Sequence, residues 1–172
     1  MPRNLKIVVT GPFGAGKTQF VKTISDIAVV STERRVSHRV KGGKAQTTVA
    51  MDYGKVALGD DVLHLNGTPG QARFDFMWEI LGREMQGLVV LVDSTDERSF
   101  PEAVDLIEYF THSRRVPYLV AANKQDLGGA ASTDRLRRSL GLHPEALIMP
   151  CVASRKTSVR QVLSQLAELI PA

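Results

Sequence analysis

Residues 11–18 read G-P-F-G-A-G-K-T and directly follow the short β-branched run Leu5–Thr10. This order satisfies the pattern G-x-x-x-x-G-K-[ST], in which glycines let backbone N–H groups converge on phosphate oxygens at the start of a helix. We predict that helix over Lys17–Val29, where apolar residues recur at helical spacing. A strand, a phosphate-binding turn and a helix in this order restrict the chain to an α/β fold with a parallel sheet.

Each residue type in this segment, called the phosphate loop below, has a chemical role. We expect Lys17 to contact the terminal phosphates as a catalytic group and the Thr18 hydroxyl to ligate Mg²⁺. A glycine-rich turn without a ligand is the alternative. The expected nucleotide contacts of this segment are Gly11, Phe13, Gly14, Ala15, Gly16, Lys17, Thr18 and Gln19.

The rest of the chain alternates strand and helix patterns. Strands are predicted over 5–10, 48–58, 61–65, 87–93, 117–122 and 146–152, and helices over 17–29, 74–84, 101–113, 133–140 and 159–170. The Gly59-Asp60 turn joins two of the strands into a hairpin, whereas the polar, basic residues 30–47 are predicted to form a long flexible loop. We therefore predict one α/β domain over 1–172, with a mostly parallel sheet, one antiparallel edge strand and helices on both faces.

A second motif, N-K-Q-D at residues 123–126, follows the strand predicted over 117–122. Ligands of α/β sheets bind at the carboxyl ends of the strands. A carboxylate there can accept hydrogen bonds from guanine N1–H and from the exocyclic amine, a donor pair that adenine lacks. Asp126 is therefore predicted to select guanine, and Asn123 and Lys124 are expected to contact the nucleotide. An ordinary turn with a helix cap is the alternative.

Together these residues resemble the Ras-like small GTPases over essentially the whole chain. The segments T-T-V-A-M-D-Y-G and G-T-P-G-Q-A-R-F also resemble a prokaryotic branch, the MglA-like and conservon-type small GTPases. The resemblance implies a P-loop G-domain that binds GTP or GDP with Mg²⁺ and hydrolyses GTP. It also implies that Val152, Ala153 and Ser154 form the last base-contacting loop.

The resemblance further assigns two segments that respond to the γ-phosphate. Residues 30–47 become switch I and residues 67–71 become switch II, and both are ordered by GTP and relax after hydrolysis. Thr48 would ligate Mg²⁺, with Thr47 as the alternative. The Gly70 N–H would meet the γ-phosphate, and Gln71 would orient the attacking water as a catalytic residue.

The chain departs from the family pattern at three places. In L-N-G-T-P-G-Q, residues 65–71, Gly67 stands where the family has an aspartate that holds Mg²⁺ through water. Asp52, four residues beyond Thr48, is a candidate substitute, and an exposed strand residue without such a role is the alternative. Phe13 stands where relatives have a small residue, so its ring must point away from the γ-phosphate or crowd Gln71. The segment 152–154 is a loose match to the usual Ser-Ala pair.

Composition limits the location and the partners that we expect. No apolar run approaches the roughly 20 residues that cross a bilayer, and the ends carry no lipidation signal, so we expect a cytoplasmic monomer without a membrane anchor of its own. The net charge is +4, and its basic run at 33–44 lacks the interleaved aromatics of nucleic-acid binding, so we expect no nucleic acid partner. Cys151 is expected to be a buried structural thiol.

Three functions are compatible with these residues and motifs. The first is a molecular switch that hydrolyses GTP slowly and relies on a GTPase-activating or roadblock-type regulator and on effector proteins. The second is an adaptor that binds GDP or GTP without hydrolysis, which the departures at Gly67 and Phe13 favour. The third, an ATP-dependent enzyme, shares the phosphate loop but is disfavoured by residues 123–126.

Overall fold

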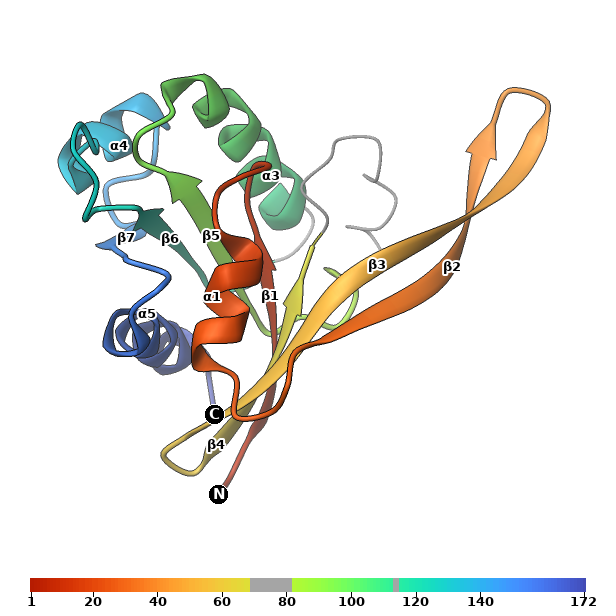
Figure 1. Ribbon diagram of the computed structural model, residues 1–172, viewed down its shortest axis with the longest axis horizontal. Coiled ribbons are helices and arrows are strands. Elements are labelled where there is room, and N and C mark those ends of the chain that lie inside the picture. The colour runs from red at the N-terminus through yellow and green to blue at the C-terminus, as the bar shows by residue number, and fades with distance from the viewer. Residues whose placement is uncertain (69–81, 113–114) are drawn as a thin grey trace.

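The computed structural model describes residues 1–68, 82–112 and 115–172, and for 32–40 and 44–50 it describes the backbone alone (Figure 1). Seven strands of the described residues form one sheet in the order β2-β3-β4-β1-β5-β6-β7. Their bounds are β1 Asn4–Thr10, β2 Val30–Val40, β3 Gly43–Leu58, β4 Asp61–Gly67, β5 Gly87–Asp93, β6 Tyr118–Asn123 and β7 Leu147–Pro150.

The five strands from β4 to β7 run parallel, as the alternating pattern predicts. The interior strand β5 is buried along Gly87–Val92, because helices cover both of its faces. The β3 strand is antiparallel to β4, and β2 is antiparallel to β3, so an antiparallel pair forms this edge of the sheet. The predicted α/β fold class is thus confirmed.

Two apolar cores lie on the two faces of the sheet. One core packs α1 (Lys17–Ile24) and α5 (Lys156–Leu169) against one face. The other packs α3 (Phe100–His112) and α4 (Thr133–Ser139) against the opposite face, and the 3₁₀ helix η2 (Glu97–Ser99) leads into α3. The helix predicted over 74–84 lies almost entirely outside the described residues.

The prediction of a flexible loop over 30–47 is wrong. These residues form all of β2, the turn at Lys41-Gly42 and the beginning of β3, with Val40 opposite Gly43. Gly42 has a φ of 99°, which the turn requires and which glycine adopts without strain. Figure 1 shows this hairpin extending well beyond the other strands, and backbone pairing between β2 and β3 runs along its whole length.

Helix α1 ends at Ile24, five residues earlier than predicted. Ser25 leaves the helical conformation, with φ −61° and ψ 131°. Its hydroxyl donates to the Ile27 carbonyl at 2.8 Å and accepts from the Lys55 N–H at 3.1 Å, so the chain is fastened to β3 instead. A serine side chain that bonds nearby backbone groups competes with the helix in this way.

Two smaller expectations can be checked on the described residues. Cys151 is buried, and burial raises the pKa of its thiol to about 11, so the sulfur is protonated at neutral pH. No helix among the described ranges is both long enough and apolar enough to cross a membrane.

Candidate functional site

The phosphate loop has the backbone conformation of an anion-binding turn. Gly11, Gly14 and Gly16 all have positive φ values, of 153°, 80° and 102°. Gly16 is the N-cap of α1, and a glycine there offers no side-chain oxygen to the N–H groups of the first turn. Those N–H groups, together with the positive end of the helix dipole, remain available for an anion.

Lys17 places its ammonium over the same loop. It donates to the carbonyl oxygens of Gly11 and of Pro12, the latter at 3.3 Å. Burial lowers the pKa of Lys17 to about 8, and the negative charges of Glu102 and Asp52 offset part of that effect. A desolvated ammonium at the mouth of an anion-binding turn has the charge and position to contact phosphate.

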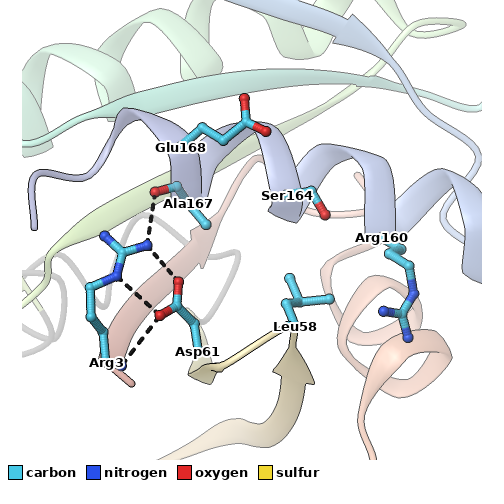
Figure 2. A pocket seen from close by; sticks show the side chains of 8 residues that line it. Arg3, Leu58, Asp61, Arg160, Ser164, Ala167 and Glu168 are labelled. Atoms are coloured by element: carbon cyan, nitrogen blue, oxygen red, sulfur yellow. Dashed lines mark hydrogen bonds and ion pairs between the residues drawn. The ribbon is translucent and has the colours of Figure 1, made fainter. Parts of the chain in front are cut away.

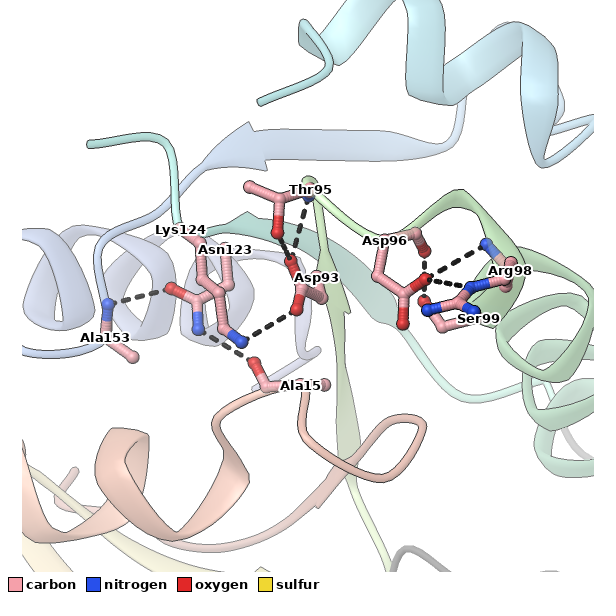
Figure 3. Close-up of polar contacts among 9 residues, drawn as sticks. All are labelled: Ala15, Asp93, Thr95, Asp96, Arg98, Ser99, Asn123, Lys124 and Ala153. Carbon is pink, nitrogen blue, oxygen red and sulfur yellow. Dashed lines mark hydrogen bonds and ion pairs between the residues drawn. The ribbon is translucent and has the colours of Figure 1, made fainter. Parts of the chain in front are cut away.

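Asn123 ties three segments of the site together, as Figure 3 shows. Its Nδ2 donates to the Ala15 carbonyl at 2.8 Å, and its Oδ1 accepts from the Ala153 N–H at 2.9 Å. The side chain is buried with only 3% exposure, so both bonds are made in a water-poor environment. The phosphate loop, the end of β6 and the segment 152–154 are therefore held in one arrangement.

Lys124 and Asp93 form an ion pair at the ends of β6 and β5. The Lys124 ammonium lies 2.7 Å from Asp93 Oδ2, while Thr95 donates to Asp93 Oδ1 from its N–H and its hydroxyl (Figure 3). Burial alone would raise the pKa of Asp93, but the bonds from Lys124 and Thr95 outweigh it and hold that pKa below its usual range. Asp93 was not among the residues predicted for the site, although its place at the carboxyl end of a buried strand was a usable signal.

The remaining residues of the guanine motif, Gln125 and Asp126, lie on a loop that is held by hydrogen bonds from the Gln125 side chain. Gln125 donates through its side chain to the Ser94 hydroxyl and to the Ala131 carbonyl, each at 2.9 Å. Asp126, next in the chain, is exposed at this edge. The Val152 N–H donates to the Ser158 hydroxyl at 2.9 Å, and Ser154 is exposed. Asp126 is thus accessible to a ligand, and the Gln125 N–H just before it donates to the Cys151 carbonyl at 3.3 Å, next to the segment 152–154.

Thr18 and Asp52 meet on the other side of the phosphate loop. The Thr18 hydroxyl donates to Asp52 Oδ2 at 2.6 Å. Asp52 lies on β3 directly opposite Gly67, the last residue of β4. Thr68, the next residue, is fixed to the end of β1 because its hydroxyl lies 2.8 Å from that of Thr10 and its N–H donates to the Val9 carbonyl at 2.9 Å.

The other predicted residues fall into two groups. Gln19 and Phe13 are described: the Gln19 amide donates to the Thr23 hydroxyl along the helix, and the Phe13 ring is 76% exposed. Thr48 lies on β3 opposite Arg35, with only its backbone described. Gly70 and Gln71 lie outside the described residues. The structure thus brings together the phosphate-loop and guanine-motif residues but leaves the switch II positions open.

A separate cavity of about 270 Å³ lies between the β3–β4 turn and α5. Figure 2 shows Arg3 at its edge, paired with Asp61 at 2.5 Å and directed toward the end of α5. Arg3 also donates to the Ile170 carbonyl at 2.9 Å. Because the polar groups around Arg3 are satisfied by one another, we interpret this corner as a structural clamp on the C-terminal helix.

Comparisons with known proteins agree with this geometry. The family model described as "ADP-ribosylation factor family" matches residues 1–170. ADP-ribosylation factor-like protein 3 of Caenorhabditis elegans is 32% identical over 143 residues, which is 81% of this chain and 71% of that protein. The mutual gliding-motility protein MglA of Myxococcus xanthus is 25% identical over 97% of this chain and 90% of its own length.

A solved small GTPase structure is similar to this chain in fold. The Arl6 BBS3 small GTPase from Trypanosoma brucei, with the bound nucleotide analogue GppNp, superposes with a TM-score of 0.72. The match covers 96% of each chain at 21% sequence identity. At this identity the likeness concerns the fold alone, and it agrees with the strand order and the helical layers described above.

Proposed function

Since the chain belongs to the ADP-ribosylation factor family of Ras-like small GTPases, and is therefore a GTP-binding switch protein, we propose that it hydrolyses GTP to GDP slowly and with help from an activating partner. The observation that supports a joined nucleotide site in this proposal is the position of Asn123. Its two hydrogen bonds join the phosphate loop to the loop at 152–154. A nucleotide whose phosphates bind to the phosphate loop would therefore have its base next to the loop at 152–154.

We propose that guanine is recognised at the carboxyl end of β6. The exposed Asp126 carboxylate accepts from guanine N1–H and the exocyclic amine, and the Ala153 backbone contacts the base oxygen. Support comes from the bond between the Ala153 N–H and Asn123 Oδ1, which holds residue 153 next to the end of β6; on binding guanine, this N–H exchanges Asn123 Oδ1 for the base oxygen. Lys124, fixed by Asp93, lies along the nucleotide with its stem.

The phosphates are bound in this proposal by the phosphate loop and by Lys17. Backbone N–H groups of residues 14–18 contact the β-phosphate, and the Lys17 ammonium exchanges the carbonyls of Gly11 and Pro12 for phosphate oxygens. The positive charge offsets the charge that develops on the γ-phosphate oxygens during in-line attack.

The residues beside the phosphate loop also fit Mg²⁺. Mg²⁺ prefers hard oxygen ligands, and it is commonly held by one or two carboxylates together with substrate phosphates. The Thr18 hydroxyl at the start of α1 and the Asp52 carboxylate that accepts from it supply such oxygens. We propose that the ion would be held by Thr18 and Thr48 and would supply positive charge that stabilises the phosphate oxygens.

The hydrolytic step is assigned to switch II. Gln71 orients the attacking water, and the Gly70 N–H reports the presence of the γ-phosphate. Support comes from Thr68, which precedes both residues in the chain and is bonded to Thr10 and Val9 at the end of β1, directly before the phosphate loop. Loss of the γ-phosphate releases switch II and changes its affinity for effector and regulator proteins, among which we propose a roadblock-type regulator.

The competing function is an adaptor that binds guanine nucleotide without hydrolysis, favoured by the glycine at position 67 and by the exposed ring of Phe13. Phosphate release under single-turnover conditions separates the two. We expect the wild-type protein to convert bound GTP to GDP in the presence of Mg²⁺, and Gln71→Leu to slow the conversion at least tenfold without weakening GTP binding.

Gln165→Leu, on the exposed surface of α5, is the matched control and should hydrolyse GTP at the wild-type rate. If no phosphate appears from either wild-type protein or Gln71→Leu, even when candidate activating proteins are added, the adaptor function replaces the switch.

A further inference from the structure

We propose that Asp52, on β3, supplies the carboxylate of the magnesium site that position 67 cannot supply. The inference rests on the proposed function, because it concerns the metal that accompanies the nucleotide. It differs from the family pattern in the strand that carries the acid: the charge has moved from β4 to the neighbouring antiparallel strand.

The sheet register places the two positions side by side. Asp52 and Gly67 are direct partners across the antiparallel β3–β4 ladder. Direct partners in such a ladder project their side chains from the same face of the sheet. An acid at either position can therefore bring its carboxylate to the same region at the end of β4.

The carboxylate of Asp52 is already directed at the metal-ligand residue. Its Oδ2 accepts from the Thr18 hydroxyl at 2.6 Å, a short bond typical of a charged acceptor. This bond uses the proton of the hydroxyl and leaves the oxygen lone pairs of Thr18 for a cation. Partners that orient a ligand in this way are a regular part of metal sites.

The glycine at position 67 also suits this arrangement. A Cβ built on Gly67 would lie 3.3 Å from the Asp52 Cβ, a tight approach that a small shift must relieve, and 3.9 Å from its Oδ2, an ordinary van der Waals contact. The glycine on β4 therefore leaves the Asp52 side chain in place without such a shift.

The charge of Asp52 reaches the phosphate loop as well. It raises the pKa of Lys17, although burial and the charge of Glu102 have larger effects on that ammonium. An acid that acts on both Lys17 and Thr18 lies where the metal and the terminal phosphates must meet. The remaining alternative is that Asp52 anchors Thr18 for the sake of the fold alone.

Release of a fluorescent GDP derivative from the full chain, followed at a series of free Mg²⁺ concentrations and in excess chelator, separates these roles. In Asp52→Asn we expect the Mg²⁺ concentration that half-maximally slows release to rise at least tenfold, in line with the 10- to 100-fold effect of outer-shell partners on metal affinity. Release in chelator should stay within about twofold of wild type, because no metal is then present for Asp52 to hold. Asp60→Asn, in the turn at the far end of β3, removes the same charge and should leave both values unchanged.

A variant that moves the aspartate from position 52 to position 67 tests the proposal through a recovery of Mg²⁺ affinity. Asp52→Gly should show the same raised Mg²⁺ requirement as Asp52→Asn, and adding Gly67→Asp to it should restore most of the wild-type value. An unchanged Mg²⁺ midpoint in Asp52→Asn, or equal acceleration of release with and without metal, would overturn the proposal and leave a structural anchor. Failure of the wild-type protein to bind fluorescent GDP would instead overturn the proposed function itself.

Discussion

The Lys124 ammonium lies 2.7 Å from the Asp93 carboxylate, and the pair joins the carboxyl ends of two neighbouring parallel strands. Lys124 has a φ of 65°, a left-handed conformation uncommon outside glycine, so its direction is set by the loop and not by local preference. The ion pair fixes that direction. It therefore connects the fold of the sheet to the base-recognition loop.

Removing the Asp93 charge should destabilise the protein. We expect Asp93→Asn to lower the free energy of unfolding by about 1–2 kcal/mol at pH 7, because a hydrogen-bonded charge is lost beside a half-buried ammonium. The lowered pKa of Asp93 means that its stabilising effect is complete above the usual aspartate pKa of about 4 and is lost as the pH falls below it. Urea unfolding at pH 7 and near pH 3 measures both.

The surface aspartate Asp105 on α3 provides the control. Asp105→Asn should change the free energy of unfolding by less than about 0.5 kcal/mol at either pH. If Asp93→Asn is as stable as Asp105→Asn at pH 7, the ion pair does not contribute as described.

Two glycines of the phosphate loop offer a matched comparison. Gly14 and Gly16 both have left-handed φ values, but a Cβ on Gly14 would meet nothing within 4 Å, whereas one on Gly16 would lie 2.5 Å from Asn123 Nδ2. Gly14→Ala should therefore cost only the backbone strain, about 1–2 kcal/mol in unfolding. Gly16→Ala should cost more and should also weaken GDP binding at least tenfold beyond Gly14→Ala, because it displaces Asn123.

Thermal unfolding with and without GDP measures this difference. Equal losses of stability and equal GDP affinities in the two variants would show that Asn123 does not need the space above Gly16.

The lowered pKa of Lys17 predicts proton uptake on nucleotide binding. The free protein holds Lys17 largely uncharged above about pH 8, whereas phosphate favours the ammonium. GDP affinity should therefore be nearly flat around pH 7 and fall by up to about tenfold per pH unit above pH 8. The pH dependence of folding stability has the opposite direction. Between about pH 8 and 10.5 the unfolded chain binds the proton that the folded chain has lost at Lys17. The contribution of Lys17 to the free energy of unfolding therefore rises with pH.

Calorimetric titration of GDP at pH 8.5, in two buffers of different ionisation enthalpy, reports the proton directly. Wild-type protein should take up a fraction of a proton, and Lys17→Met should take up less. The same proton count for both proteins would assign the uptake to another group.

Sequence patterns predicted the parallel part of the fold well, because each buried strand carries its own apolar run. The β5 strand over Gly87–Asp93 is an example, and the structure reproduces its bounds. The β2 strand was missed for the opposite reason. Most residues of β2 are polar, and the strand is paired through backbone hydrogen bonds with β3. Because backbone pairing does not depend on apolar side chains, an edge strand of this kind shows little apolar periodicity in its sequence.

Within the site, motif residues were predictable and their partners mostly were not. The Asn123 bonds to Ala15 and Ala153 bring together residues far apart in the chain, and no local pattern contains that information. The Asp52 and Gly67 pairing is an exception. A two-residue turn at 59–60 sets Leu58 opposite Asp61. Moving away from the turn by the same number of residues on each strand places residue 52 opposite residue 67.

Competition between nucleotides tests most directly the claim that the loops joined by Asn123 form a guanine-nucleotide site. Fluorescent GDP bound to the wild-type protein should be displaced by equimolar GTP but not by a hundredfold excess of ATP. Asp126→Asn should lose at least about tenfold in GTP affinity, since a charged acceptor of two hydrogen bonds is replaced by a neutral one. Displacement by ATP as effective as by GTP, or an unchanged GTP affinity in Asp126→Asn, would contradict the site described here.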